Sequence, residues 1–367
     1  MKHGLVVLDP TEIPSAEWDA RLRAVQARLR AAGARVGLIY NDVSRGEDIG
    51  YLTNLVVYWN EGVLAIPAEG DPTLLTKLSK RVFSWMRRTS VLTDLRSGKS
   101  FGKLVGDYLC GQPAGAIGFI DADLWPAAYL DEIAAAAPEW TAVELGPLVR
   151  EARAMLSAAE LGVTRAGAPV FRAALAAADA AGPDLRARMG ALESTARHGG
   201  FTDLTLRGFG ADGAETDGAG ADGAETDGAG TGGVDGAGTV GTIEVAGQYR
   251  HSWLLAGRSY AARSVRDRLA AAQASALGAL GSGAGWPAVE AAARGALALP
   301  AGATAAISWI RQVDFANLGE LRPRQRTGPA AGEAGALRIE VFAADGRRGV
   351  LTDTFLIVDG PPELLTA

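Results

Sequence analysis

Two acidic side chains lie in neighbouring strand-like segments near the end of the printed sequence, and their type could support chemistry. The segment LRIEVF, residues 337–342, alternates apolar and polar residues around Glu340, as a half-buried strand does. A second apolar run follows the turn AADGRRG and contains Asp353. We expect the two runs to form a β-hairpin or an adjacent strand pair that positions both carboxylates.

A third acid and a histidine lie in the segment TIEVAGQYRHSWLLAGR, residues 242–258, which reads as strand, turn and strand. Glu244 is in the first strand, and His251 follows Tyr249 by two residues. The pKa of an imidazole suits acid–base catalysis, so His251 is a candidate catalytic residue. A lone histidine on a predicted strand is more often an ordinary core or surface residue, and both interpretations stay open.

The candidate residues all lie in the second half of the chain. Before them, residues 1–148 predict an α/β domain. Residues 15–35 have the apolar spacing of an amphipathic helix, with Gly33 as its stop, and a buried strand follows at 36–40. Strand and helix signals then alternate up to about Leu148. A second domain is predicted over 149–367, opening with two helices that run to about Gly199 and are separated near Gly182-Pro183.

These segments together resemble the pita-bread family, which includes creatinase, Xaa-Pro aminopeptidase and methionine aminopeptidase. The first domain has the family's Tyr-Leu-Thr element at 51–53, and the domain junction matches at the positions Arg153, Ser157, Glu160 and Arg165. The end of the chain is similar to the family pattern G-V-R-I-E-D-T-V-L-V. The resemblance implies an α/β N-terminal creatinase-like domain plus an α+β pita-bread C-terminal domain.

Two-metal members of that family bind their ions through Asp, Asp, His, Glu and Glu. The resemblance assigns four of these positions here, to Glu244, Leu255, Glu340 and Asp353. Leucine cannot donate an electron pair to a metal, and no histidine follows His251 in the sequence. Three carboxylates without a nitrogen ligand are a poor set for zinc, manganese or cobalt, so we expect no cofactor and at most weak binding of a divalent metal.

The strand registers lead us to expect that these four side chains converge in one cleft of the second domain. Leu255 should then be buried. The alternative to a functional site is that the acids are residual polar groups, paired with Arg258, Arg338 or water.

The composition of the chain excludes some classes of binding partner. The formal net charge of −6 argues against a nucleic-acid partner, which would require a basic face. Cys110 is the single cysteine, so a reducing cytoplasm fits, and we expect it to be a buried small apolar residue at the end of a helix. No apolar run approaches the roughly 20 residues of a membrane span, so a membrane partner is not expected.

Residues 208–241 contain a perfect tandem copy of ADGAETDGAG and no lysine or arginine. Such a segment buries too little apolar surface to offset its chain entropy, so it predicts a flexible acidic loop. Calcium binding is the competing interpretation, although the ligand order of known calcium loops is absent.

The sequence thus predicts a divergent Xaa-Pro aminopeptidase-like or creatinase-like protein without a dinuclear metal site, hence a pseudoenzyme with a binding or scaffold role, or a catalyst of metal-free hydrolysis of a small amide or guanidino compound. A metal-dependent aminopeptidase or prolidase with non-standard ligands, and a regulatory partner of an active paralogue, are the alternatives. A small molecule or short peptide is the expected ligand, and the family resemblance implies a homodimer.

Overall fold

A computed structural model describes residues 8–43, 45–56, 60–210, 215–216, 241–320, 329–344 and 347–367, with backbone only at 215–216 and 317–320. The chain divides into two compact units. Unit 1 comprises Met1–Arg153 and Ser157–Glu160, and unit 2 comprises Ala154–Leu156 and Leu161–Ala367. The division follows Arg153, whereas the sequence suggested a boundary between residues 148 and 149.

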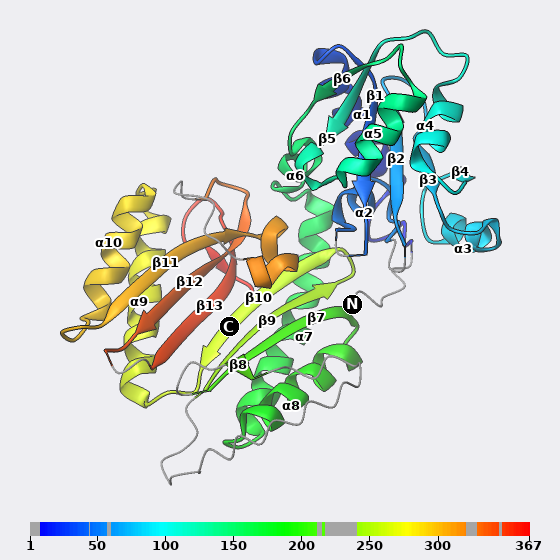
Figure 1. Ribbon diagram of the computed structural model, residues 1–367. Coiled ribbons are helices and arrows are strands. Elements are labelled where there is room, and N and C mark those ends of the chain that lie inside the picture. The colour runs from blue at the N-terminus through cyan, green and yellow to red at the C-terminus, as the bar shows by residue number, and fades with distance from the viewer. Residues whose placement is uncertain are drawn as a thin grey trace. The chain divides into compact units, whose positions relative to one another are not determined.

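Unit 1 contains a mixed six-stranded sheet in the order β4, β3, β2, β1, β5, β6 (Figure 1). Strand β2 is antiparallel to both β1 and β3, while β1 with β5, β3 with β4, and β5 with β6 are parallel pairs. The strands are β1 (Ala34–Asn41), β2 (Gly62–Pro67), β3 (Thr73–Thr76), β4 (Asp94–Ser97), β5 (Ala116–Ile120) and β6 (Thr141–Glu144).

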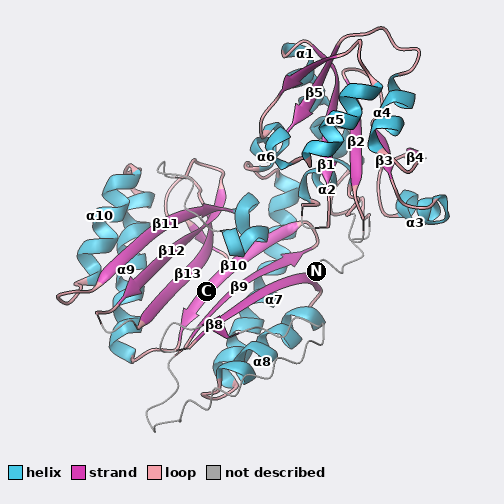
Figure 2. Ribbon diagram, viewed as in Figure 1, coloured by secondary structure: helices cyan, strands magenta, loops and turns pink. Residues whose placement is uncertain are grey.

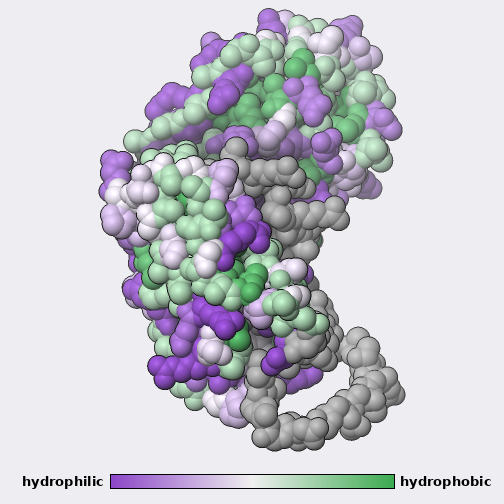
Figure 3. Space-filling model, turned by 90° about the vertical axis from the view of Figure 1, so that its left-hand side faces the viewer, coloured by the Kyte–Doolittle hydropathy of each residue, from purple (hydrophilic) through white to green (hydrophobic). Residues whose placement is uncertain are grey.

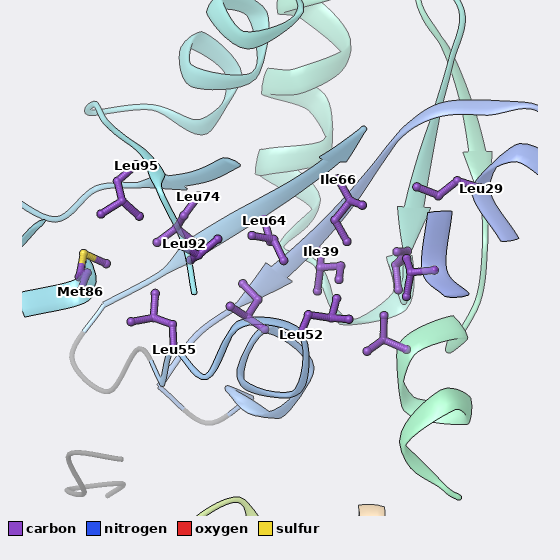
Figure 4. Packing of buried hydrophobic residues seen from close by; sticks show 14 of the residues in the cluster. Leu29, Ile39, Leu52, Leu55, Leu64, Ile66, Leu74, Met86, Leu92 and Leu95 are labelled. Atoms are coloured by element: carbon purple, nitrogen blue, oxygen red, sulfur yellow. The ribbon is translucent and has the colours of Figure 1, made fainter. Parts of the chain in front are cut away.

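Helices pack on both faces of this sheet, as the βα alternation of the sequence predicts. One apolar layer, seen in Figure 4, joins Leu29, Leu52 and Met86 to strand residues such as Ile39 and Leu64. The helices are α1 (Ser15–Ala31), α2 (Glu47–Thr53), α3 (Phe83–Arg88), α4 (Phe101–Leu109), α5 (Ala127–Ala136) and α6 (Leu148–Arg153), with short 3₁₀ turns at Lys80–Val82 and Ala122–Leu124.

The environment of Cys110 differs from the sequence prediction. The apolar face of α4 ends at Leu109, and Cys110 is the capping residue just beyond it, with an exposed side chain. The expectation of a buried cysteine is therefore wrong, because the helix ends one residue earlier than the apolar run suggested.

Asp121 follows β5 with a left-handed backbone, at φ 50°. Burial raises the pKa of its carboxyl to about 6, and the charge of nearby Asp48 adds to the rise. The folded protein therefore holds a proton there that the unfolded chain releases near pH 4. Binding of this proton to Asp121 stabilises the folded protein below about pH 4, and the stabilisation is lost as the pH rises through 6.

We expect Asp121→Asn to stabilise the protein at pH 7 by on the order of 1 kcal/mol, less than full linkage because the side chain is only half-buried. Asparagine keeps the shape and tolerates positive φ. Urea unfolding at pH 4 and pH 7 checks this. An equal gain at both values would contradict the titration argument.

The junction between the units contains a reciprocal cap at two of the positions that the family resemblance matched. The Ser157 hydroxyl accepts from the N–H of Glu160 at 3.1 Å, and the Glu160 carboxylate accepts from the N–H of Ser157 at 2.9 Å. This capping box satisfies two backbone donors that a helix start leaves unpaired. It fixes the first turn of the 23-residue helix α7 (Ala158–Ala180).

Unit 2 is built on an eight-stranded antiparallel sheet, with the main order β11, β12, β13, β10, β9, β7, β8 and with β14 beside β13. Its strands are β7 (Phe201–Phe209), β8 (Glu215–Thr216), β9 (Thr242–Tyr249), β10 (Ser252–Ser259), β11 (Thr304–Arg311), β12 (Ala334–Phe342), β13 (Arg348–Leu356) and β14 (Glu363–Leu364).

Helices cover one face of the unit 2 sheet, and the other carries only the short helix η3 within the described part of the chain (Figures 1 and 2). We call these the helix face and the open face. The covering helices are α7, α8 (Leu185–His198), α9 (Arg263–Gly281) and α10 (Trp286–Leu297), and η3 spans Gln312–Glu320.

Both hairpins predicted from the sequence are confirmed, because β9 pairs with β10 and β12 pairs with β13. The two predicted helices before Gly199 are α7 and α8. The predicted loop 208–241 needs a correction at its start, since β7 continues to Phe209 and β8 pairs with it. Most of that loop, 211–214 and 217–240, lies outside the described residues.

Hydrophilic and hydrophobic residues are mixed over the face that Figure 3 shows. The large apolar side chains that are exposed, among them Val43, Met155 and Phe342, are spread along the chain. Within the described ranges, no helix combines the length and the apolar character needed to cross a membrane.

Candidate functional site

One row of residues crosses the open face in register. Glu244 on β9 pairs with Gly257 on β10, which pairs with Thr352 on β13, which pairs with Arg338 on β12. Arg207 on β7 continues the row on the other side of Glu244. Directly paired residues of a sheet point to the same face, so these side chains share the open face.

Glu244 of this row and Glu340, two residues beyond Arg338 on β12, take part in a closed ring of ion pairs with two arginines. Arg338 donates through Nε to Glu244 at 2.7 Å and through Nη1 to Glu340 at 2.8 Å. Arg348 donates through Nη2 to Glu244 at 3.0 Å and through Nε to Glu340. Each of the four carboxylate oxygens thus accepts from a guanidinium group. We call these four residues the Glu/Arg ring.

Small residues in the middle strands allow the ring to close. Glu244 and Arg338 lie three strands apart, about 14 Å at the usual strand spacing, so their side chains must meet above β10 and β13. The residues beneath are Gly257 and Thr352. A Cβ on Gly257 would lie 2.9 Å from Thr352 Oγ1, so even alanine would crowd this row.

The ring is electrically balanced and largely buried. Burial disfavours the charged form of Glu244, but Arg338 and then Arg348 outweigh it and hold the pKa of this carboxyl below its usual range. Burial likewise opposes the charge of Arg338, and Glu244 and Glu340 raise its pKa above the ordinary value. Glu244 and Arg338 are therefore charged at neutral pH. The guanidinium of Arg348 also lies over the ring of Phe209, with 4.0 Å between Cζ and the ring centroid.

Leu255 is on the same face, two residue pairs along the strands from the pair of Glu244 and Gly257, where it opposes Ala246. It is 1% exposed, which confirms the expected burial. Its neighbours are apolar, and η3 contributes Phe315 to this group. The cluster consists of Ala246, Trp253, Leu255, Ile310, Phe315 and Ala336.

Asp353 lies on the opposite, helix face, so the expected convergence of all four positions is wrong. It pairs with Leu337, which packs among the helix residues, and its carboxylate accepts from Gln273 on α9 at 3.0 Å. Arg258 at 2.6 Å and the Thr366 hydroxyl at 2.8 Å complete its partners. The expected pairing with Arg258 is confirmed, as is that of Glu244 and Glu340 with Arg338.

The physical reason for this correction is the alternation of side chains along β13. Only every second residue of a strand faces the same side, so Thr352, and not Asp353, shares the face of Glu244 and Glu340. In the family pattern the residues Glu and Asp are adjacent. A shift of one position places Asp353 at that Asp and Thr352 at the Glu.

Sequence reasoning also missed Arg348, which lies in the turn sequence AADGRRG that separates the two predicted strands. The alternation Arg348, Val350, Thr352 was the signal that could have placed it on the open face. His251 is not brought to the ring. It lies at the turn between β9 and β10, six residues from Gly257, which is about 20 Å along a strand.

Among the residues whose positions the structure gives, no group of three or more His, Cys, Asp or Glu side chains is arranged to hold a metal ion. On the open face, the aliphatic Leu255 and the hydroxyl of Thr352 stand where carboxylates would be needed. The residues present do not fit a dinuclear centre.

Comparison with known proteins places the fold. No family model matches the sequence, and no curated protein matches it. Solved structures do match over nearly the full length. This chain has the fold of the prolidases and Xaa-Pro peptidases.

Three of these structures match nearly the whole of this chain and nearly the whole of their own chains. The Xaa-Pro dipeptidase of Bacillus anthracis has a TM-score of 0.74 at 13% identity, covering 95% of this chain and 97% of its own. The X-Pro aminopeptidase of Thermotoga maritima has a TM-score of 0.73 at 14% identity, covering 94% of this chain and 97% of its own. The prolidase of Pyrococcus horikoshii has a TM-score of 0.70 at 12% identity, covering 95% of this chain and 98% of its own. These likenesses confirm the predicted two-domain architecture.

Proposed function

We propose that this chain is a metal-independent binding protein built on the fold of the Xaa-Pro peptidases, and not a metallopeptidase. The observation that carries the proposal is the Glu/Arg ring. Its two acids are two of the three that the sequence resemblance places at metal-ligand positions, and every oxygen of both already accepts from an arginine.

A divalent cation entering this ring would have to displace at least one guanidinium. That arginine would remain buried without its partner, which is among the costliest arrangements in a protein interior. The side chains nearby offer no compensation, because Leu255 has no donor atom and Thr352 offers only a hydroxyl. A stable two-metal centre of the kind that activates water between two ions is thus disfavoured by the ligands and by the charge.

Metal content and peptidase activity test the proposal on the purified full chain. We expect less than stoichiometric zinc, manganese or cobalt by elemental analysis, and no cleavage of Xaa-Pro dipeptides after incubation with manganese or cobalt. One or two tightly held equivalents of metal, lost in the variant Glu244→Gln, would overturn the proposal. If the ring is structural, Glu244→Gln changes stability and leaves metal content unchanged.

Restoring one carboxylate should not restore a metal site. We expect Leu255→Asp to bind no manganese and to cleave no Xaa-Pro dipeptide, because Arg338 and Arg348 still occupy Glu244 and Glu340. Leu255→Asn is the matched control, since it is polar and uncharged. Manganese-dependent cleavage by the Asp variant but not by the Asn variant would contradict the structural interpretation.

The expected ligand is a small molecule or a short peptide, and the expected assembly is a homodimer in the cytoplasm. Light scattering of the purified chain checks the assembly. A mass corresponding to one chain would contradict the dimer.

A further inference from the structure

A second cluster of charged and aromatic side chains lies at one edge of the unit 1 sheet. The register pairs Asn41 with Gly62 and Gly62 with Thr76, so β1 and β3 end where β2 begins. Glu61 immediately precedes β2, and Lys77 immediately follows β3. Both therefore lie at the end of the sheet where β1 and β3 finish.

This edge is where open α/β sheets bind their ligands. The chain passes from β1 outward through β2, β3 and β4, and then returns to place β5 on the other side of β1. The strand order reverses between β1 and β5. Ligands of open sheets bind outside the carboxyl ends of the strands at such a reversal.

Glu61 and Lys77 form an ion pair that hydroxyl groups hold in place. The Glu61 carboxylate accepts from Lys77 Nζ at 3.1 Å, from the Tyr129 hydroxyl at 2.8 Å and from the Tyr40 hydroxyl at 2.8 Å. Lys77 also donates to the Tyr129 oxygen at 2.7 Å. Neither charge depends on a single contact for its position.

Aromatic rings fix the ammonium group further. Lys77 Nζ lies 4.2 Å from the ring centroid of Tyr129 and 4.6 Å from that of Phe101, which suits cation–π attraction. The ring of Tyr40 packs against Trp125 at 5.5 Å. An exposed ion pair is ordinarily mobile and contributes little to stability, whereas this one is held from several sides.

The pair is nevertheless accessible and keeps unused bonding capacity. The side chains of Lys77 and Glu61 are 24% and 29% exposed. An ammonium has three N–H donors, and hydrogen bonds to described residues use two of them. From the described residues Glu61 Oε1 accepts one bond, and it can accept another. A positive donor and a negative acceptor thus remain side by side.

We propose that Glu61 and Lys77 form a binding site for the zwitterionic end of a free α-amino acid. The ligand carboxylate meets Lys77 and its ammonium meets Glu61, in an antiparallel arrangement of alternating charges. The spacing suits this pairing, because the nitrogen and the carboxyl carbon of an α-amino acid are about 2.5 Å apart. A ligand with one of the two charges leaves the other member of the pair without a new partner.

Both protein groups are charged under ordinary conditions. Burial opposes the charge of Glu61, but the Tyr129 and Tyr40 hydroxyls and Lys77 lower its pKa below the usual range. Burial also opposes the charge of Lys77, and Tyr129 and Glu61 raise its pKa. The rings of Phe101 and Tyr40 are buried, so the ligand side chain gains few contacts. We therefore expect weak selectivity among amino acids and a millimolar Kd.

Equilibrium dialysis of the full chain with L-alanine tests the site. Propionate lacks the ammonium group of alanine and ethylamine lacks its carboxylate, so the three probes separate the two charges. We expect saturable binding of L-alanine, and binding of propionate and ethylamine weaker by at least about tenfold. No saturable binding of L-alanine, or propionate binding as tightly, would overturn the proposal.

Variants tie the binding to this pair. Lys77→Met and Glu61→Gln should each raise the Kd for L-alanine by at least about tenfold, a clear change on the free-energy scale of binding. Lys103→Met removes one partner of the exposed pair with Asp107 in the same unit and should leave the Kd unchanged.

An equal effect of Lys103→Met would reveal a general charge effect and reject the site. Thermal melts verify that each variant is folded. If Lys77→Met is unfolded, Tyr129→Phe replaces it, because it keeps the ring and removes only the hydroxyl. An unchanged Kd in Tyr129→Phe and Glu61→Gln would likewise reject the site.

Discussion

Arg338→Met should lower the free energy of unfolding by about 3–5 kcal/mol at pH 7. The substitution keeps an unbranched side chain of similar length but removes the charge that bridges Glu244 and Glu340. Both carboxylates are buried, so each would lose a guanidinium without gaining water. Only Arg348 would remain to balance two negative charges. Urea unfolding followed by tryptophan fluorescence measures the loss.

The matched control is Arg263→Met on helix α9. Arg263 pairs with Asp267 on the surface, with both side chains largely exposed, and such pairs are worth about 0–1 kcal/mol. The same chemical change should therefore have little effect there. Similar losses in both variants would mean that the Glu/Arg ring is not a buried ion-pair network.

The deficit of Arg338→Met should shrink as the solution is acidified. The folded-state pKa of Glu244 is depressed, so its contribution is present above its unfolded value of about 4.5 and is lost as the pH falls through the folded value. Once Glu244 is protonated, the missing arginine matters less. We expect the two unfolding curves to approach each other toward pH 3. A constant gap would contradict an electrostatic origin.

Local patterns predicted the elements of this fold because they depend on neighbouring residues. The helix stop at Gly33 requires a left-handed backbone, which it has at φ 71°. The alternation around Glu340 likewise predicted the strand.

The candidate site was harder to predict because it depends on register across several strands. A slip of one residue transfers a side chain to the other face, and the family pattern was matched at Asp353 without this test. The closure of the ring depends on Arg348. This residue begins β13, although the sequence around it resembles a turn. Exposure of Cys110 depended similarly on where a helix ends.

Asp353→Asn should lower the free energy of unfolding by about 3–5 kcal/mol, an effect comparable to breaking the ring, although Asp353 lies on the other face. The change keeps the size of the side chain and removes the charge opposite Arg258. The two carboxylate oxygens of Asp353 also accept hydrogen bonds from Gln273 and Thr366, and asparagine would keep only one of these two oxygens. Hydrogen exchange of the amides at 363–366, together with urea unfolding, measures the outcome.

Thr366→Val is the matched control for the terminal segment. It removes the hydroxyl that donates to Asp353 and accepts from the N–H of Thr354, and it leaves the Asp353–Arg258 pair intact. We expect it to speed exchange at 363–366 and to cost about 1–3 kcal/mol, less than Asp353→Asn. Because Asp353 and its partners lie on the helix face, neither variant should alter the metal content of the protein. A change in metal content in Asp353→Asn would mean that this carboxylate belongs to a metal site after all, and would restore the register expected from the sequence.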